Sequence, residues 1–225
     1  MIDRLQPKSL YYYSASMWKL FWNSNWWSVI GIIMGRTVLF KTKLGAAFWS
    51  RRLMDLWTIK EVVMDDVYRL NWIKIKKGDV VIDIGAATGD FSIIAARRGA
   101  VVYAYEPDPD RLELLGMNML QNRVNSISVG GFAAESLDDI FDKRKIRSCK
   151  LLKVDCEGCE YRIFSRASKK TLKKISNLAM EVHLFDSNMQ RDFSDLKSKL
   201  INNDFEITVL DNQVHRNVKY LFASK

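Results

Sequence analysis

Short apolar runs alternate with amphipathic segments along the chain from residue 79 onward. The runs Val80–Ile84 and Val101–Tyr105 are continuous and rich in β-branched or aromatic residues, as in strands that are buried on both faces. We predict strands at 80–84, 101–105, 127–129, 151–154, 178–182, 205–210 and 220–223, and helices at 91–98, 109–122, 136–141 and 193–201. This alternation predicts an α/β protein with a doubly wound, mostly parallel sheet that helices cover on both faces.

Residues 1–78 have a different pattern, rich in aromatic side chains. An apolar stripe with helical spacing predicts a helix over residues 17–34, formed by Trp18, Phe21, Trp22, Trp26, Val29, Ile30 and Ile33. We favour packing of this stripe against the rest of the protein or a second subunit, and the alternative is a peripheral membrane contact through helix 17–34. The uncharged run 20–35 contains polar residues and is too short for a membrane span, and no small-residue cleavage site of a signal peptide follows it.

The segment after this helix predicts a hairpin over residues 37–51 that turns near Gly45, followed by a helix over 56–70. The change of pattern at Gly78 divides the chain into an aromatic-rich N-terminal region, residues 1–78, and a second domain, residues 79–225. We therefore expect the α/β sheet to carry a helix-plus-hairpin appendage at its N-terminal end.

Composition narrows the class of protein. The chain has 225 residues with 48% hydrophobic side chains, which excludes wholesale disorder and fibrous repeats. Three cysteines cannot form a disulfide framework in a chain of this length, and their odd number favours reduced thiols and a cytoplasmic location. The net charge of +9 raises the possibility of a polyanionic partner, either nucleic acid or an anionic membrane.

The segment Asp83-Ile-Gly85-Ala86-Ala-Thr-Gly89 lies between a predicted strand and a predicted helix. Glycines in such a turn let backbone N–H groups approach a ligand, and ligands of doubly wound sheets bind at this end of the strands. The spacing differs from the G-x-G-x-x-G of dinucleotide sites, so a nucleoside with an amino-acid tail fits this loop better than a pyrophosphate.

Glu106 ends the second predicted strand, in the sequence Tyr105-Glu106-Pro107-Asp108. An acid at about this distance beyond a glycine turn accepts hydrogen bonds from ribose hydroxyls in related folds. Glu106 could instead be a solvated surface acid, but its position after the strand favours ribose binding.

Two further groups follow the fourth and fifth predicted strands, at the same edge of the sheet. Asp155, with Glu157 and Glu160 behind it, could orient a substrate or take a proton, although the two glutamates could simply favour the start of the next helix. His183 titrates near neutral pH and is either a general base or a packed strand residue. The spacing Cys156-x-x-Cys159 lacks the remaining ligands of a zinc site, so we expect no metal and no redox role.

These motifs, in this order, resemble the FkbM family of S-adenosylmethionine-dependent methyltransferases. The resemblance covers residues 78–185 and rests mainly on Glu106-Pro107-Asp108-Pro109, Ser136-Leu-Asp-Asp139 and Asp155-Cys-Glu157-Gly-Cys-Glu160, with Glu181-Val-His183 at its end. The stretch that includes Asp55–Glu61 and Asp66–Tyr68 resembles the segment that precedes the domain in this family.

The resemblance implies a class I methyltransferase (Rossmann-like) fold with a seven-stranded sheet. It implies S-adenosyl-L-methionine as the cofactor and O-methylation of a hydroxyl on a sugar, glycan or related small molecule, with Asp155 or His183 as the catalytic proton acceptor. The implied cofactor-binding residues are Asp83, Gly85, Ala86, Gly89, Glu106, Pro107 and Asp155. Cysteines stand where the family has small apolar residues, which favours a packing role for Cys156 and Cys159.

The chain departs from the family in the short segment 127–136. Either residues 132–135 close the adenine side of the pocket, or the chain is a degenerate, non-catalytic relative that works as a binding or assembly module. A nucleic-acid acceptor is disfavoured, because Asp155 is not followed by the Pro-Pro-aromatic motif of base methylation. The positive charge is concentrated in residues 1–80 (+7) and 143–174 (+9), with −7 elsewhere. This distribution favours an anionic acceptor or membrane surface, and homo-oligomers remain compatible with it.

Overall fold

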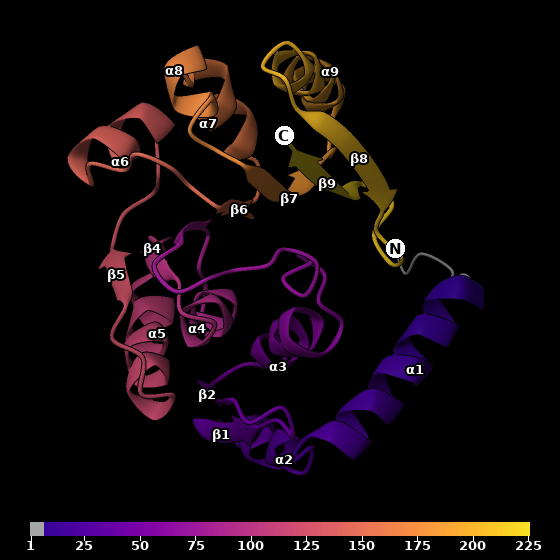
Figure 1. Cartoon of the computed structure of the whole chain (residues 1–225). Helices are drawn as coiled ribbons and strands as arrows, with labels where there is room; N and C mark the ends of the chain where they lie inside the picture. Colours follow the sequence, from indigo (N-terminus) through magenta and orange to yellow (C-terminus); the bar gives the residue numbers. More distant parts are fainter. Residues whose placement is uncertain (1–6) are drawn as a thin grey trace.

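The computed structural model describes residues 7–225, with side chains from residue 11 onward. Its centre is a seven-stranded sheet with the order β5-β4-β3-β6-β7-β9-β8, in which only β9 runs antiparallel to its neighbours (Figure 1). The strands are β3 (Val80–Ile84), β4 (Val101–Tyr105), β5 (Ile127–Gly130), β6 (Leu151–Val154), β7 (Asn177–His183), β8 (Glu206–Asp211) and β9 (Val218–Ser224). The predicted doubly wound, mostly parallel sheet is therefore confirmed.

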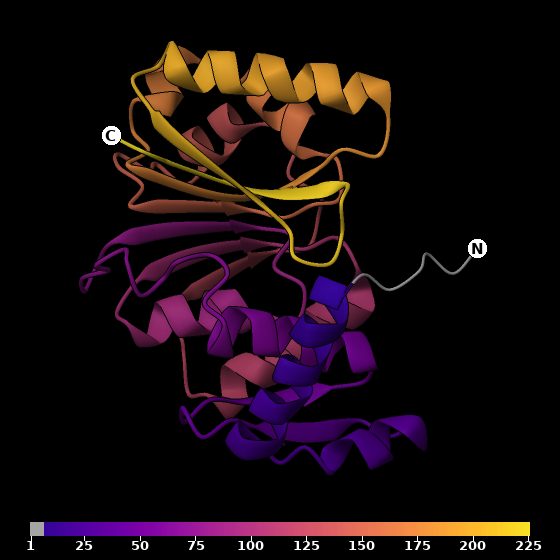
Figure 2. The same ribbon diagram turned by 90° about the vertical axis from the view of Figure 1, so that its right-hand side faces the viewer.

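Helices cover both faces of this sheet, as the two layers of Figure 2 show. One layer contains α6 (Leu137–Lys143), α7 (Glu160–Arg166), α8 (Lys169–Leu172) and α9 (Ser187–Ile201). The other contains α4 (Asp90–Arg97) and α5 (Pro109–Gln121), against which the N-terminal region packs. The central strand β6 is buried along its whole length, including the side chain of Lys153 among its apolar residues.

Several helices begin where their sequences supply a capping side chain. Asp108 accepts a hydrogen bond from the backbone N–H of Asp110 (2.8 Å), with Pro109 in the first turn of α5. Asp186 accepts from the N–H of Met189 (2.8 Å) at the start of α9. Such side chains satisfy backbone donors that a helix leaves unpaired.

The predicted helix over residues 17–34 is wrong in its extent. The structure has two helices instead, α1 (Pro7–Asn23) and α2 (Ser28–Ile33). The break occurs because Asn25 bonds to the hairpin: its side chain donates to the carbonyl of Leu39 (2.9 Å) and accepts from the N–H of Lys41 (2.6 Å). These long-range bonds replace the helical pairing at residues 24–27.

The predicted hairpin is present as β1 (Val38–Lys41) and β2 (Ala47–Ser50), paired antiparallel. The helix that follows is shorter than predicted: α3 (Leu53–Ile59) continues as the π-helical turn η1 (Lys60–Met64) and ends there instead of at residue 70. Asp66 and Arg69 adopt positive φ angles of 52° and 57°, which a helix cannot accommodate. The turn η1 carries the buried amine of Lys60, which lies 2.5 Å from Asp65.

Most of the aromatic stripe is exposed in this chain, so packing against the rest of the protein, one of the two arrangements that we favoured, is wrong, while packing against a second subunit stays a prediction. Trp18 is 66% exposed, Trp22 is 51% exposed and Ile33 is 71% exposed. The helices instead turn small polar residues inward, and Ser16 is only 3% exposed. No helix in the described part of the chain is long and apolar enough to cross a membrane.

The expectation of reduced thiols throughout is also wrong in the structure. Cys156 and Cys159 form a disulfide across a four-residue turn, whereas Cys149 is free and buried. Burial raises the pKa of the Cys149 thiol to about 12, so this side chain behaves as a small apolar residue.

A buried ion pair joins the neighbouring strands β3 and β6. The Nζ atom of Lys153 lies 3.0 Å from an Asp83 carboxylate oxygen and donates a hydrogen bond to the carbonyl of Gly85 (2.6 Å). Asp83 also accepts from the hydroxyl of Ser92 (2.7 Å). Burial lowers the pKa of Lys153, but the carboxylates of Asp83, Asp155 and Asp90 together outweigh it and the net pKa is raised, so the amine stays charged.

This pair generates a prediction about stability. Lys153→Met leaves the Asp83 carboxylate buried without its counter-charge, so we expect the free energy of unfolding to fall by about 3–5 kcal/mol in denaturant titrations. The control is the double variant Asp83→Asn with Lys153→Met, which removes both charges and should be more stable than the single variant. Equal stability of wild type and Lys153→Met would contradict the assignment.

Candidate functional site

The loop between β3 and α4 makes a sharp turn at Gly85. Gly85 has a φ angle of 76°, and a Cβ atom there would lie 1.7 Å from the carbonyl oxygen of Asp155. The N–H of Asp155 in turn donates to the carbonyl of Ile84 (2.9 Å). Only glycine therefore lets the ends of β3 and β6 approach this closely.

The other predicted residues of this loop lie beneath it. Asp83 is fully buried in its ion pair with Lys153, and Ala86 is 1% exposed within the core. Gly89 has a φ angle of 84° just before α4, and a Cβ atom there would lie 2.9 Å from Leu115. These three residues support the loop from the side that packs against the protein core.

Glu106 is held rigidly where β4 ends. One carboxylate oxygen accepts from the N–H of Ala87 (2.8 Å) and the other accepts from the N–H of Asp108 (2.9 Å). The side chain is only 3% exposed. Each oxygen keeps a lone pair that can accept a further hydrogen bond, so Glu106 is preorganised as a double acceptor.

A cavity of about 310 Å³ lies above these strand ends. Its lining residues are Ile84, Gly85, Tyr105, Glu106, Pro107, Asp108, Arg111, Ala133, Ala134, Asp155, Cys156, Glu157 and Cys159. Four of the predicted cofactor residues, Gly85, Glu106, Pro107 and Asp155, thus meet around one space. The sequence motifs that are far apart in the chain converge because parallel strands end at the same edge of the sheet.

The short segment after β5 forms one wall of this cavity. Ala133 and Ala134 line it, and the ring of Phe132 contacts the ring of Tyr105 at a centroid distance of 5.5 Å. The opposite wall contains the Cys156–Cys159 disulfide and Glu157. The shortened segment 127–136 therefore still encloses a cavity.

Glu160 lies behind this wall and holds His183. The Glu160 side chain is fully buried, and it accepts from the backbone N–H of Gly158 (2.8 Å) and of His183 (3.1 Å). The same carboxylate lies 3.3 Å from Nδ1 of the His183 ring. Glu160 therefore fixes the turn after β6 and the orientation of the imidazole.

Three side chains come together beside the cavity: Asp155, Glu181 and His183, which we name the acid–histidine cluster. Each offers one ligand-type atom, and these atoms lie within 4.8 Å of one another. The hydroxyl of Tyr68 donates to Asp155 (2.8 Å). Two carboxylates and an imidazole can exchange protons, and they are also donors that divalent cations accept.

The cluster has unusual electrostatics. Burial, followed by repulsion from Asp155, raises the pKa of Glu181 to about 8. Burial lowers the pKa of His183, but the carboxylates of Glu160, Glu181 and Asp155 outweigh it, so the net pKa lies above its ordinary value. The cluster consequently retains protons at neutral pH that isolated side chains would release.

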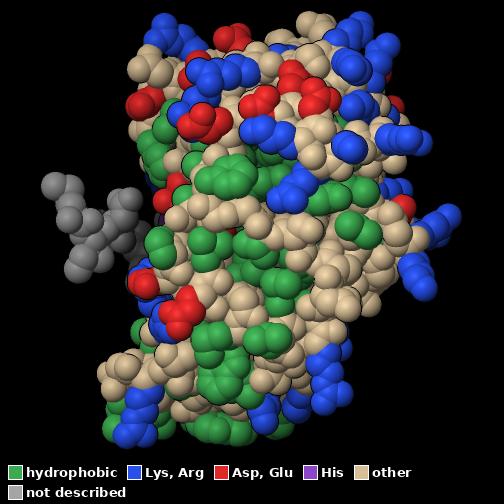
Figure 3. Space-filling model, turned by 90° about the vertical axis from the view of Figure 1, so that its left-hand side faces the viewer, with side chains coloured by type: hydrophobic (Ala, Val, Ile, Leu, Met, Phe, Trp, Pro, Cys, Tyr) green, Lys and Arg blue, Asp and Glu red, His purple; other side chains and the backbone are tan. Residues whose placement is uncertain are grey.

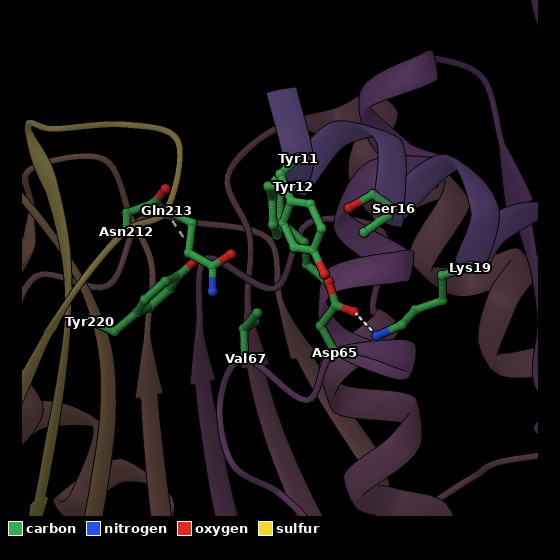
Figure 4. A pocket seen from close by; sticks show the side chains of 11 residues that line it. Tyr11, Tyr12, Ser16, Lys19, Asp65, Val67, Asn212, Gln213 and Tyr220 are labelled. Atoms are coloured by element: carbon green, nitrogen blue, oxygen red, sulfur yellow. Dashed lines mark hydrogen bonds and ion pairs between the residues drawn. The ribbon is translucent and has the colours of Figure 1, made fainter. Parts of the chain in front are cut away.

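A second pocket, of about 360 Å³, is lined by residues of α1, of the segment 61–67 and of the β8–β9 hairpin. Figure 4 shows Tyr11 and Tyr12 of α1 facing Tyr220 of β9 and Gln213 of the β8–β9 turn, with Lys19 bonded to Asp65 below. Tyr220 pairs with Glu181 in the strand register, and its ring lies 6.5 Å from that of Tyr68. Tyr220 therefore links the wall of this pocket to Glu181 of the acid–histidine cluster.

Sequence reasoning missed Tyr68, the burial of Glu181 and this second pocket. The pocket combines residues from 11–19, 61–67 and 212–220, and no local motif marks any of these stretches. Tyr68 had one signal, its place in the segment that resembles the region before the domain.

Comparison with known proteins gives two kinds of match. The model of the methyltransferase FkbM domain matches residues 132–207. The 31-O-demethyl-FK506 methyltransferase FkbM of Streptomyces tacrolimicus is 34% identical over 67 residues, 29% of this chain and 26% of that protein. The ribosomal protein L11 methyltransferase of Bacillus cytotoxicus is 45% identical over 58 residues, 25% of this chain and 19% of that protein. The chain thus matches about a quarter or less of the length of these relatives.

The fold is also that of solved methyltransferase structures. The crystal structure of M. jannaschii TYW2 in complex with AdoMet superposes with a TM-score of 0.52, at 18% identity, over 84% of each chain. The matched residues 132–207 include Asp155 and His183, and the architecture agrees with the strand-end positions of both Glu106 and Asp155. Residues 132–207 of the chain are therefore similar to the methyltransferase FkbM domain, and the chain as a whole has the Rossmann-like fold of the solved methyltransferase structures.

Proposed function

We propose that the chain is an S-adenosylmethionine-dependent methyltransferase that acts on a hydroxyl of a sugar, glycan or related small molecule. The observation that carries the proposal is the meeting of Gly85, Glu106 and Asp155 around one cavity, directly beside the acid–histidine cluster. A cofactor site and a proton-accepting group are the two parts that methyl transfer to a hydroxyl needs.

The cavity residues fit a nucleoside cofactor. Glu106, anchored by two backbone N–H groups, would accept the two ribose hydroxyls, and Ala133 and Ala134 offer an apolar wall for a base. Gly85 lets the end of β6 approach the loop, so that Asp155 stands at the edge of the cavity. When bound there, S-adenosylmethionine would supply the electrophilic methyl group. Asp83, Ala86 and Gly89 would act indirectly, by shaping the loop that contacts the cofactor.

The acid–histidine cluster would manage the proton of the acceptor hydroxyl. Asp155 lines the cofactor cavity and belongs to the cluster, so it lies between the two reactants. Asp155 or His183 would accept the proton, and Glu181 is a third group in the cluster that can hold a proton. Glu160 keeps the imidazole oriented throughout.

The second pocket would hold the acceptor. Tyr11, Tyr12 and Tyr220 offer ring faces and hydroxyls, and Asn212 and Gln213 add amide groups. Aromatic rings pack against the apolar faces of sugar rings, while amides and hydroxyls bond to sugar hydroxyls. A volume of about 360 Å³ suits a group of that size.

The direct test of the proposed function is transfer of an isotope-labelled methyl group from S-adenosylmethionine to a panel of free sugars and alkyl glycosides. We expect a product whose label survives alkali, as a methyl ether does and a methyl ester does not. Labelling of amines, or only of carboxyl groups, would reject hydroxyl methylation. Failure to bind the cofactor at all would support the non-catalytic alternative.

Glu106→Gln tests the ribose assignment. The amide keeps the shape of the side chain but can no longer accept bonds from both backbone N–H groups and both hydroxyls. We expect calorimetry to show an affinity for S-adenosylmethionine about 10- to 100-fold weaker than in wild type. The matched control is Glu135→Gln, an exposed acid beside the same wall, which should bind like wild type. Unchanged affinity in Glu106→Gln would rule out a ribose contact.

The pH dependence of stability tests the proton-holding cluster. Because the pKa of Glu181 rises from 4.5 to about 8 on folding, the folded chain holds a proton that the unfolded chain releases. Stability should therefore fall as the pH rises through this window, and the raised pKa of His183 acts in the same direction.

Glu181→Gln mimics the protonated acid. Between about pH 5 and pH 8, we expect its free energy of unfolding to fall by at least about 1 kcal/mol less than that of wild type. Denaturant titrations across the range give the measurement. The exposed control Glu206→Gln should retain the wild-type slope. A Glu181→Gln slope as steep as that of wild type would reject the raised pKa, and added Mg²⁺ that flattens the wild-type slope would indicate cation binding instead.

A further inference from the structure

The two N-terminal helices present a continuous aromatic surface to solvent. We define the aromatic patch by its exposed apolar residues, which are Trp18, Phe21, Trp22, Trp26, Trp27, Ile30, Ile33 and Met34. The Phe21 ring contacts those of Trp22 and Trp26 at 5.4 Å and 5.3 Å, and Trp18 contacts Trp22 at 5.6 Å. These rings pack mainly on one another and leave one side of the cluster uncovered.

The orientation of these helices is the reverse of that of an ordinary surface helix. Ser16, Ser24 and Ser28 face the protein and are 3%, 8% and 9% exposed, while every member of the aromatic patch is at least 41% exposed. A helix normally buries its apolar face and exposes its polar one. The outward apolar face is therefore suited to an environment other than water.

The surroundings of the patch are positively charged. Residues 4–54 contain eight Lys or Arg and no Asp or Glu. Lys41 and Lys43 adjoin the end of α1, since the N–H of Lys43 donates to the carbonyl of Asn23 (2.8 Å), and Arg36 follows α2. In the described part of the chain, these three exposed side chains take part in no ion pair.

The space-filling view agrees with this distribution of charge. The lower end of the molecule in Figure 3, where α2 and the β1–β2 hairpin lie, shows hydrophobic and basic side chains with no acidic ones among them. Acidic side chains on this face gather near the top, and a further group lies below the middle at the left, beside basic side chains.

We propose that the aromatic patch docks the protein on an anionic lipid bilayer. Tryptophan side chains favour the level of lipid headgroups, and Lys or Arg around them attract anionic lipids. A second copy of the chain is a poorer occupant, because a twofold interface would bring the positive charges of Arg36, Lys41 and Lys43 against their own copies.

One helix connects the docking surface to the second pocket. Tyr11 and Tyr12 of α1 line the pocket, and Trp18 and Trp22 of the same helix belong to the patch. Ten residues of helix span about 15 Å, roughly the reach of a short glycan. If the proposed function holds, the acceptors include glycans carried by membrane lipids.

Vesicle binding of the full-length protein tests the proposal. We expect cosedimentation with phosphatidylcholine vesicles that contain about 30% phosphatidylserine, weaker binding to pure phosphatidylcholine, and a blue shift of tryptophan fluorescence. The double variant Trp18→Ser with Trp22→Ser should bind these vesicles roughly tenfold more weakly or worse. Its control is Trp72→Ser, which removes a tryptophan that is 83% exposed but lies outside the patch.

A charge-reversal pair tests the basic rim. Lys41→Glu with Lys43→Glu should weaken binding to the anionic vesicles, whereas Lys169→Glu with Lys170→Glu on the distant helix α8 should not. Equal binding by all variants, or no binding by wild type, would overturn the proposal. Patch-dependent dimers in sedimentation velocity, without vesicle binding, would assign the patch to a second copy. Because the assay requires no methyl transfer, its result is independent of the proposed function.

Discussion

The buried ion pair between Asp83 and Lys153 sets the geometry on which the site depends. It joins β3 to β6, two neighbouring strands in the middle of the sheet. Strands β4 and β5 lie beyond β3 on one side, and β7, β9 and β8 lie beyond β6 on the other. The same amine holds the carbonyl of Gly85, so the charge that ties the strands together also fixes the turn above them. Buried charges cost free energy unless they are paired and hydrogen-bonded, and here both conditions are met. One interaction in the core thus fixes the positions of the glycine loop and of Asp155.

Much of the fold was predictable because its determinants are local. Continuous β-branched runs mark the buried strands, and Asp108 with Pro109 marks the start of α5. The break between α1 and α2 was not predictable, because Asn25 bonds to a hairpin that lies later in the chain. Periodicity identified the aromatic stripe but could not tell which face of the helix turns inward. That the serines are buried and the tryptophans exposed depends on tertiary contacts, which the local sequence does not contain.

The residues of the candidate site also fall into those that the local sequence predicts and those that only tertiary contacts reveal. Glu106, Asp155 and His183 could be identified because each follows a predicted strand, and parallel strands bring their carboxyl ends together. The roles of Glu160 and Tyr68 depend on contacts made across the fold, through the His183 ring and the Asp155 carboxylate respectively. The pocket beside β9 could not be predicted, because α1 reaches it from the opposite end of the sequence.

Helix α1 contributes residues to two separate surfaces, the second pocket and the aromatic patch. Tyr12 faces the β8–β9 turn, and Trp22 faces solvent, with the buried Ser16 between them fixing the rotation of the helix. An α-helix turns by about 100° per residue, so inserting or deleting one residue between these positions would rotate one surface away from the other. Changes of length are compatible with both only in nearly whole turns, about three or four residues at a time. The spacing of α1 is thus a constraint that acts on insertions and deletions rather than on the identity of any single side chain.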